Sequence, residues 1–290
     1  MPIPAIPPAA GATAIADRFA FLLIWLLLAM PAAAQENLAI PLADGQGVSW
    51  QLQATLCRPA GDAPARLLVL NHGAVGSAEG RAAMAPEPCE HPSIGWFTSR
   101  GFAVLQPMRR GFGQTGGEWA EGSGRCPDMN FVGAGQESAR DIAAAVAFGL
   151  AMPGIRPGDA VVAGHSAGGW AVLALAADPP PGVSVLINIA GGRGGPLPRN
   201  SCRNERLVEA AATFGRSARL PMLWLYADTD PLFTSDLADR LHAAFTAAGG
   251  NARLRVLRAR GWDGHALFWH PQGAAVWGPP LARFMGLRPL

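Results

Sequence analysis

The sequence contains no lysine, and all 23 of its Lys or Arg positions are arginine. Lysine forms Schiff bases with carbonyl substrates, acts as the base of Ser–Lys dyads and contacts the phosphates in P-loops. Its absence excludes these three chemistries. Only 15% of the residues are charged, the net charge is +2, and the arginines are scattered along the chain. We expect no nucleic-acid partner, because such proteins present a basic patch or stripe.

The familiar metal and cofactor motifs are also missing. The four cysteines form no C-x-x-C pair and no H-E-x-x-H is present. The glycine-rich stretch 191–195 matches neither G-x-G-x-x-G nor G-x-x-x-x-G-K. These patterns are typical of zinc or redox sites, zinc peptidases and phosphate cradles. The sequence therefore predicts an activity that uses no metal and no organic cofactor.

Residues 19–30 are an apolar run that follows Arg18 and precedes the small residues 32–34. The run is shorter than the roughly 20 residues that a membrane span requires. A basic residue, an apolar run and an A-x-A site together predict a secretory signal peptide over residues 1–34. The mature protein would then start near Gln35, without a stable membrane anchor, and be periplasmic or secreted. An uncleaved N-terminal anchor is the alternative.

The even number of cysteines favours one or two disulfides in an exported chain. Four cysteines allow three complete connectivities, and the sequence alone does not choose among them. Cys126 and Cys202 both follow predicted strands, in loops expected at the same edge of a sheet. We therefore favour a Cys126–Cys202 bridge, with Cys57 and Cys89 as candidates for a second one.

Short apolar segments alternate with longer amphipathic segments along the chain. The strand-like segments are 48–57, 65–71, 102–106, 160–163, 183–189, 220–226 and 252–257, and the helical ones are 135–152, 168–177, 235–248 and 272–285. This alternation predicts an α/β fold with a mostly parallel central sheet and helices on both faces. No linker divides residues 35–290, so we expect a single domain. Only about thirty residues separate the segments ending at 189 and starting at 220, which argues against a large lid domain.

Ser166 lies in a G-x-S-x-G motif that spans residues 164–168. A short apolar strand is predicted directly before this motif, and an apolar helix directly after it. A nucleophilic serine on such a strand-to-helix turn needs tiny neighbours, because the backbone bends sharply there. Ser166 is therefore the candidate nucleophile. A glycine-rich turn with an inert serine is the alternative.

With these motifs the chain resembles the α/β-hydrolase superfamily, in particular its dienelactone-hydrolase-like and prolyl-oligopeptidase-related branch. The matching segments are residues 71–74 (NHGA), 110–113 (RGFG), 164–168 (GHSAG), 227–230 (ADTD) and 264–265 (GH). The resemblance implies an α/β-hydrolase fold and a triad in the order Ser, Asp, His. The dienelactone hydrolases that name the branch have a cysteine nucleophile, whereas this chain has a serine. The dienelactone substrate is therefore not carried over.

The general base should follow the last strand, where His265 and His270 lie. Gly264 gives His265 a flexible approach to the nucleophile, which makes His265 the first choice. His270, next to a proline, is the alternative.

The acid that orients the base should follow the segment 220–226. Asp228 and Asp230 are both available there, and the resemblance favours Asp230. Asp263, two positions before the candidate base, is an outside candidate.

The resemblance also implies an oxyanion hole formed by the backbone N–H groups of Ala167 and Ala74. Arg109 and Arg110 follow a predicted strand and are candidates for binding a substrate carboxylate. Trp119 and Trp262 lie in predicted loops and are candidates for lining the site.

The sequence thus predicts an exported serine hydrolase that cleaves carboxylic esters of small-molecule or short acyl substrates. A serine peptidase or amidase of the same fold is the main alternative. A binding protein without catalytic activity on this scaffold is a third hypothesis.

Overall fold

The computed structural model describes residues 1–2, 35–43, 47–194 and 202–288. Met1–Met30 and Pro31–Leu290 are separate units, and the account below concerns the second. The predicted signal peptide lies almost entirely outside the described residues, so it stays a prediction. Among the described residues, no helix is both long and apolar enough to cross a membrane.

One eight-stranded sheet forms the centre of the described chain, with the strand order β1-β2-β4-β3-β5-β6-β7-β8. β1 pairs with β2, and β2 with β4, in antiparallel fashion, whereas the neighbours from β4 to β8 are parallel. The strands are β1 Gln35–Ala43, β2 Ser49–Cys57, β3 Arg66–Asn71, β4 Phe102–Pro107, β5 Ala160–His165, β6 Val183–Ile189, β7 Met222–Ala227 and β8 Ala252–Leu257.

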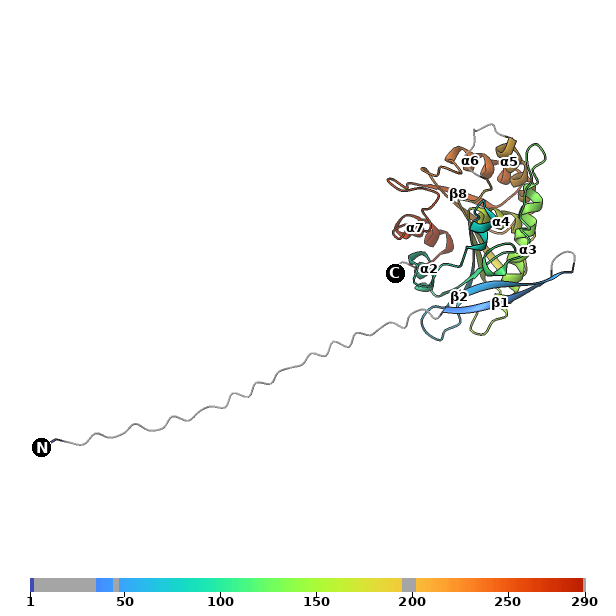
Figure 1. Cartoon of the computed structure of the whole chain (residues 1–290). Coiled ribbons are helices and arrows are strands. Elements are labelled where there is room, and N and C mark those ends of the chain that lie inside the picture. Colours follow the sequence, from blue (N-terminus) through green and yellow to red (C-terminus); the bar gives the residue numbers. More distant parts are fainter. Residues whose placement is uncertain (3–34, 44–46, 195–201, 289–290) are drawn as a thin grey trace. The chain divides into compact units, whose positions relative to one another are not determined.

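Side chains of the inner strands alternate between two apolar cores. In β3, Leu67 and Val69 belong to one core, whereas Leu68 and Leu70 belong to the other. Helices cover both faces (Figure 1). The first core is covered by α3 (Phe131–Leu150), α4 (Ala167–Leu175), α5 (Cys202–Gly215) and α6 (Ser235–Ala247), and the second by α2 (Pro92–Thr98) and α7 (Ala274–Met285). The predicted α/β class with a mostly parallel sheet is confirmed.

Five elements were not predicted: β1, the short helices α1 (Ala78–Ala82) and α2, the 3-10 helix η1 (Gly113–Thr115), and α5. β1 is an edge strand whose first residues are mostly exposed, so it lacks a strong apolar pattern. α5 carries a signal that was available in the sequence. Its buried Leu207, Ala210, Ala211 and Phe214 follow the spacing of one helix face.

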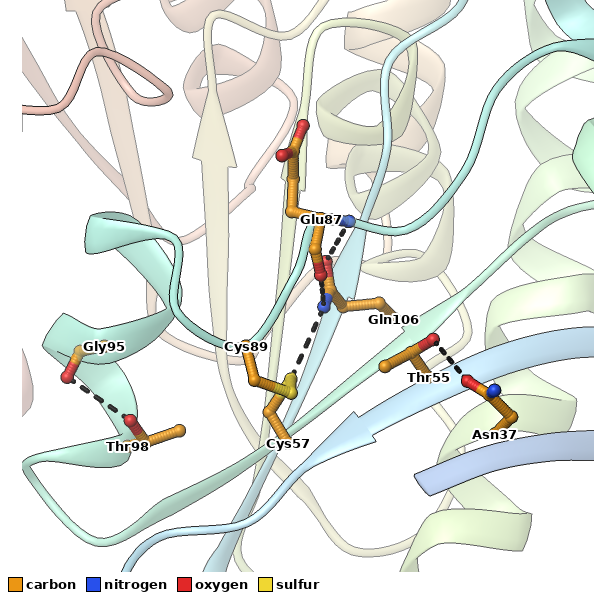
Figure 2. The surroundings of a disulfide bond; sticks show 8 residues. All are labelled: Asn37, Thr55, Cys57, Glu87, Cys89, Gly95, Thr98 and Gln106. Atoms are coloured by element: carbon orange, nitrogen blue, oxygen red, sulfur yellow. Dashed lines mark hydrogen bonds between the residues drawn. A yellow bond between two sulfur atoms is a disulfide. The ribbon is translucent and has the colours of Figure 1, made fainter. Parts of the chain in front are cut away.

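Two disulfides tie loops to the sheet and its helices, and they are the two pairs that the sequence analysis favoured. Cys57, the last residue of β2, is bonded to Cys89 in the loop before α2 (Figure 2). Beside it, Gln106 of β4 accepts a hydrogen bond from Glu87 N and donates one to Glu87 O, which fixes that loop (Figure 2). The second disulfide joins Cys126 to Cys202 at the start of α5.

Candidate active site

The sheet brings the predicted site residues to one edge. Residues of the site follow β3, β5, β6, β7 and β8, which are adjacent in the sheet. The carboxyl ends of these parallel strands lie at the same edge, where ligand sites of open α/β sheets form. The chain order of the motifs and the strand order of the sheet therefore combine to place them together.

Ser166 occupies the turn between β5 and α4. Its φ of 56° and ψ of −119° make it one of two non-glycine residues with positive φ in the described chain. Such a conformation costs about 1–3 kcal/mol and is found at functional sites. A Cβ on Gly164 would overlap the carbonyl of Gly168, and one on Gly168 would lie 2.5 Å from the carbonyl oxygens of Asn71 and His72. The motif's glycines are thus required by close backbone contact.

His265 is oriented by Asp230. The two groups meet with His265 Nδ1 3.0 Å from Asp230 Oδ2. Since a carboxylate oxygen accepts, Nδ1 carries the proton, and Nε2 of the neutral ring is left as a proton acceptor. Asp230 is buried, and its Oδ1 accepts hydrogen bonds from the backbone N–H groups of Leu232 and Phe233 at 2.8 and 2.9 Å. The backbone therefore holds the carboxylate in place.

The other candidates have different partners. Asp228 Oδ1 accepts a hydrogen bond from Ala259 N at 2.9 Å, and Asp263 Oδ1 accepts one from His265 N at 2.8 Å. Both stabilise loops. The ring of His270 stacks on Trp262, with centroids 4.2 Å apart. Of the three aspartates, only Asp230 contacts the imidazole of His265.

His165 links the base to the turn that carries Ser166. His165 Nε2 donates a hydrogen bond to the carbonyl of His265 at 2.8 Å, and the two rings have centroids 4.8 Å apart. Burial, with a smaller contribution from His265, lowers the pKa of His165 to about 4. A neutral His165 thus fixes the backbone of His265 against the residue that precedes Ser166.

The loop after β3 lies on the other side of Ser166. A Cβ on Gly73 would be 3.2 Å from Ser166 Cβ, so this loop passes in contact with the serine. The carbonyl of Gly73 accepts hydrogen bonds from His72 Nδ1 at 2.6 Å and from Arg109 Nη2 at 3.4 Å. In a trans peptide the next N–H, that of Ala74, points in the opposite direction, away from Arg109.

Three buried charges hold this loop. Arg109 donates to the carbonyl of His72 at 2.8 Å and forms an ion pair with Glu121. Arg193 also binds Glu121, at 2.7 Å. Burial by itself would raise the pKa of Glu121, but the two arginines lower it to about 2. Burial and Arg109 lower the pKa of His72 to about 3, so its Nε2 accepts a hydrogen bond from Arg109 N.

The expected substrate contacts of Arg109 and Arg110 are corrected by these surroundings. Arg109 is fully buried among Glu121 and the carbonyls of the loop. Arg110 is 4% exposed and pairs with Asp141 at 2.7 Å and with a second carboxylate on α3. Both guanidinium groups are occupied by protein acceptors. The prediction that both arginines follow a strand was correct, but the sequence did not show which acceptors surround them in the fold.

A cleft of about 480 Å³ opens at Ser166. It is lined by Ala74, Val75, Gly76, Trp119, Ser123, Gly124, Met129, Phe131, Ser166, Ala167, Gly192, Arg193, Gly194 and Arg203. Trp119 thus lines the cleft as expected, whereas Trp262 does not belong to the lining and stacks on His270. A larger hollow of about 740 Å³ beside α3 contains no residue of the candidate triad.

Sequence reasoning missed Arg193 and Arg203 as residues of the cleft. Arg193 follows β6 at the same sheet edge as the other candidates, and this position was an available signal. Arg203 lies in α5, which was not predicted. No group of three or more metal-binding side chains occurs among the residues that the structure describes.

Comparisons with known proteins agree with this architecture. Residues 91–189 match the prolyl oligopeptidase family. A search of curated protein sequences found no match. An esterase of Pyrococcus furiosus superposes with a TM-score of 0.59 at 13% identity, over 88% of this chain and 90% of that one.

Two further structures extend the comparison. A Klebsiella pneumoniae protein described as a dienelactone hydrolase gives a TM-score of 0.53 at 17% identity, over 88% of this chain and 99% of that one. A Pyrococcus horikoshii acylaminoacyl peptidase gives 0.58 at 14% identity, over 84% of this chain and 40% of that one. The fold is that of the α/β hydrolases. The match of residues 91–189 to the prolyl oligopeptidase family agrees with this fold.

Proposed function

We propose that this protein hydrolyses carboxylic esters of small-molecule or short acyl substrates through an acyl-enzyme on Ser166. The observation that carries the proposal is the contact between His265 Nδ1 and Asp230 Oδ2. Asp230 accepts a hydrogen bond from Nδ1–H, so the basic Nε2 remains for the serine. The likeness to an esterase over nearly the whole chain agrees with an ester substrate.

In the proposed reaction, His265 Nε2 takes the hydroxyl proton while Ser166 Oγ attacks the ester carbonyl carbon. The oxyanion accepts hydrogen bonds from the N–H groups of Ala167 and Ala74. Ala167 is the first residue of α4, so its N–H has no acceptor within the helix. The tetrahedral intermediate collapses, and the departing alkoxide takes the proton from His265. Water then attacks the acyl-enzyme with His265 as base, which releases the acid and restores Ser166.

Fluorophosphonate labelling followed by mass spectrometry tests the nucleophile. We expect the label on Ser166, and we expect Ser166→Ala to lower the turnover of p-nitrophenyl esters by several orders of magnitude. Ser123→Ala is the matched control, because Ser123 is another serine of the same cleft. Labelling elsewhere, or a Ser166→Ala activity within about tenfold of wild type, contradicts the proposal.

A peptidase is the second candidate, favoured by the match to the prolyl oligopeptidase family. Profiling p-nitrophenyl esters against peptide anilides separates the two. A higher kcat/KM on short peptide anilides than on any ester of the panel identifies the peptidase and refutes the esterase proposal.

We also propose that the protein acts in the periplasm or is secreted. Two disulfides support an oxidising compartment. N-terminal sequencing of the protein recovered from that compartment should find a start near Gln35, and a retained N-terminus refutes cleavage there.

A further inference from the structure

Arg203 is a charged residue of the active-site cleft that the proposed reaction does not use. Its Nε is buried without a hydrogen-bond partner. No hydrogen bond or ion pair joins its guanidinium to any of the residues that the structure describes. Buried polar groups are normally satisfied, and an exception requires an explanation such as an absent ligand.

The described residues that line the cleft include no carboxylate that could neutralise Arg203. The cleft lining includes two arginines, Arg193 and Arg203, and neither aspartate nor glutamate among the described residues. Arg193 is paired with Glu121, which Arg109 shares. On α5 itself, Glu205 pairs with Arg240 at 2.7 Å. The positive charge of Arg203 is therefore not compensated by any described residue of the cleft.

Helix stability does not explain an arginine at this position. Arg203 is the second residue of α5, where the helix dipole disfavours a cation by about 0.3–1 kcal/mol. A bound anion there would instead be attracted by both the guanidinium and the helix terminus. An arginine at this point of the helix is better explained by recognition of a ligand than by the fold.

The side chain is also held toward the cleft. It lies against Gly194, where an added Cβ would be within 3 Å of three Arg203 atoms. The adjacent Cys202 is bonded to Cys126, in the same loop as the cleft residues Ser123 and Gly124. The disulfide therefore joins the start of α5, next to Arg203, to the loop that carries Ser123 and Gly124.

We propose that Arg203 binds a carboxylate of the substrate, so that the preferred esters are anionic ones. The planar guanidinium offers paired N–H donors that match the two oxygens of a carboxylate. Trp119, Met129 and Phe131 line the same cleft and suit an apolar chain between the carboxylate and the ester. This inference rests on the proposed esterase function and specifies its substrate class.

Two ester pairs test the preference, one for each side of the scissile bond. Mono-p-nitrophenyl adipate is compared with p-nitrophenyl hexanoate, and 4-carboxyphenyl hexanoate with phenyl hexanoate. In Arg203→Met, the ratio of kcat/KM for the anionic ester to that for its neutral partner should fall about 10- to 100-fold in at least one pair, as expected when a charge-assisted hydrogen bond is lost.

Arg206→Met is the matched control, because it removes an exposed arginine of the same helix that pairs with Glu209. It should leave both ratios within about twofold of wild type, which is close to the size of surface-charge effects. The proposal is overturned if Arg203→Met leaves the kcat/KM ratio unchanged in both ester pairs. It is also overturned if Arg206→Met lowers the ratio as much as Arg203→Met does.

Calorimetric binding of monomethyl adipate separates failure of this inference from failure of the esterase proposal, because it needs no turnover. In a Ser166→Ala background, adding Arg203→Met should raise Kd for monomethyl adipate about 10- to 100-fold and leave dimethyl adipate less affected. If the wild type cleaves no ester but this difference is found, the esterase proposal fails and the anion site stands. An equal Kd for monomethyl adipate in Ser166→Ala with and without Arg203→Met overturns the anion site.

Discussion

Two loops contact the segment His165–Ser166, and they are held in different ways. The loop of His265 is fixed by two side chains that bind His265 directly, the carboxylate of Asp230 and the neutral ring of His165. The loop of Ala74 is fixed by a buried network of charges, in which Arg109 binds the carbonyls of His72 and Gly73. On the first side, side chains of the candidate triad and His165 position one another. On the second side, buried charges, of which Arg193 also lines the cleft, position the backbone.

Removal of a single group from the loop of His265 or its partners should lower kcat more than a change behind the loop of Ala74. Asp230→Asn should lower kcat by about 10⁴, because an amide favours the wrong tautomer of His265. Asp228→Asn is the matched control, since asparagine keeps the acceptor that Ala259 N uses. Steady-state kinetics with a p-nitrophenyl ester decide between them. A large loss in Asp228→Asn or Asp263→Asn, with Asp230→Asn active, would reassign the acid.

A change behind the loop of Ala74 should lower kcat less, because the N–H donors remain and only a group that holds the loop is removed. Arg109→Met should lower kcat by about 10- to 100-fold with little change in KM, less than the 10²–10³ that follows removal of an oxyanion donor. If this variant does not fold, Arg109→Met combined with Glu121→Gln avoids leaving the carboxylate with one partner fewer.

Arg110→Met controls for the loss of a buried arginine, since Arg110 pairs with Asp141 away from the loop of Ala74. It should lower thermal stability but retain kcat. An equal loss of kcat in Arg110→Met and Arg109→Met would show that Arg109 acts on the fold as a whole and not on the loop.

The last prediction concerns the stability of the folded protein in acid, to which His165 contributes. The pKa of His165 in the folded protein, about 4, lies below its unfolded value of about 6.5. The unfolded chain therefore binds more protons between these values, and the free energy of unfolding falls as the pH drops from 6.5 to 4. The contribution is on the order of 3 kcal/mol.

His165→Gln keeps a donor for the carbonyl of His265 but has no titrating ring. Urea unfolding at pH 7 and pH 4.5 should show a smaller loss of stability for this variant than for wild type. The same loss in both proteins would show that His165 does not cause the acid sensitivity.

The motifs in the chain were sufficient to predict the fold class, and they singled out a candidate triad that stays a prediction. Strands buried on both faces produce continuous apolar runs, and the strained turn at Ser166 needs glycines at fixed positions. Such requirements involve residues that are close in the sequence, so they can be recognised from the sequence alone. β1 escaped prediction because an exposed edge strand has no such run.

The roles of the arginines required the tertiary structure. Arg109, Arg110, Arg193 and Arg203 are the same residue type, and nothing local distinguishes them in the sequence. Glu121 and Asp141 neutralise the first three through contacts between distant parts of the chain, and the fourth is left without such a partner among the described residues. The energy of a charge depends on its burial and on its partners, which only the folded chain brings together.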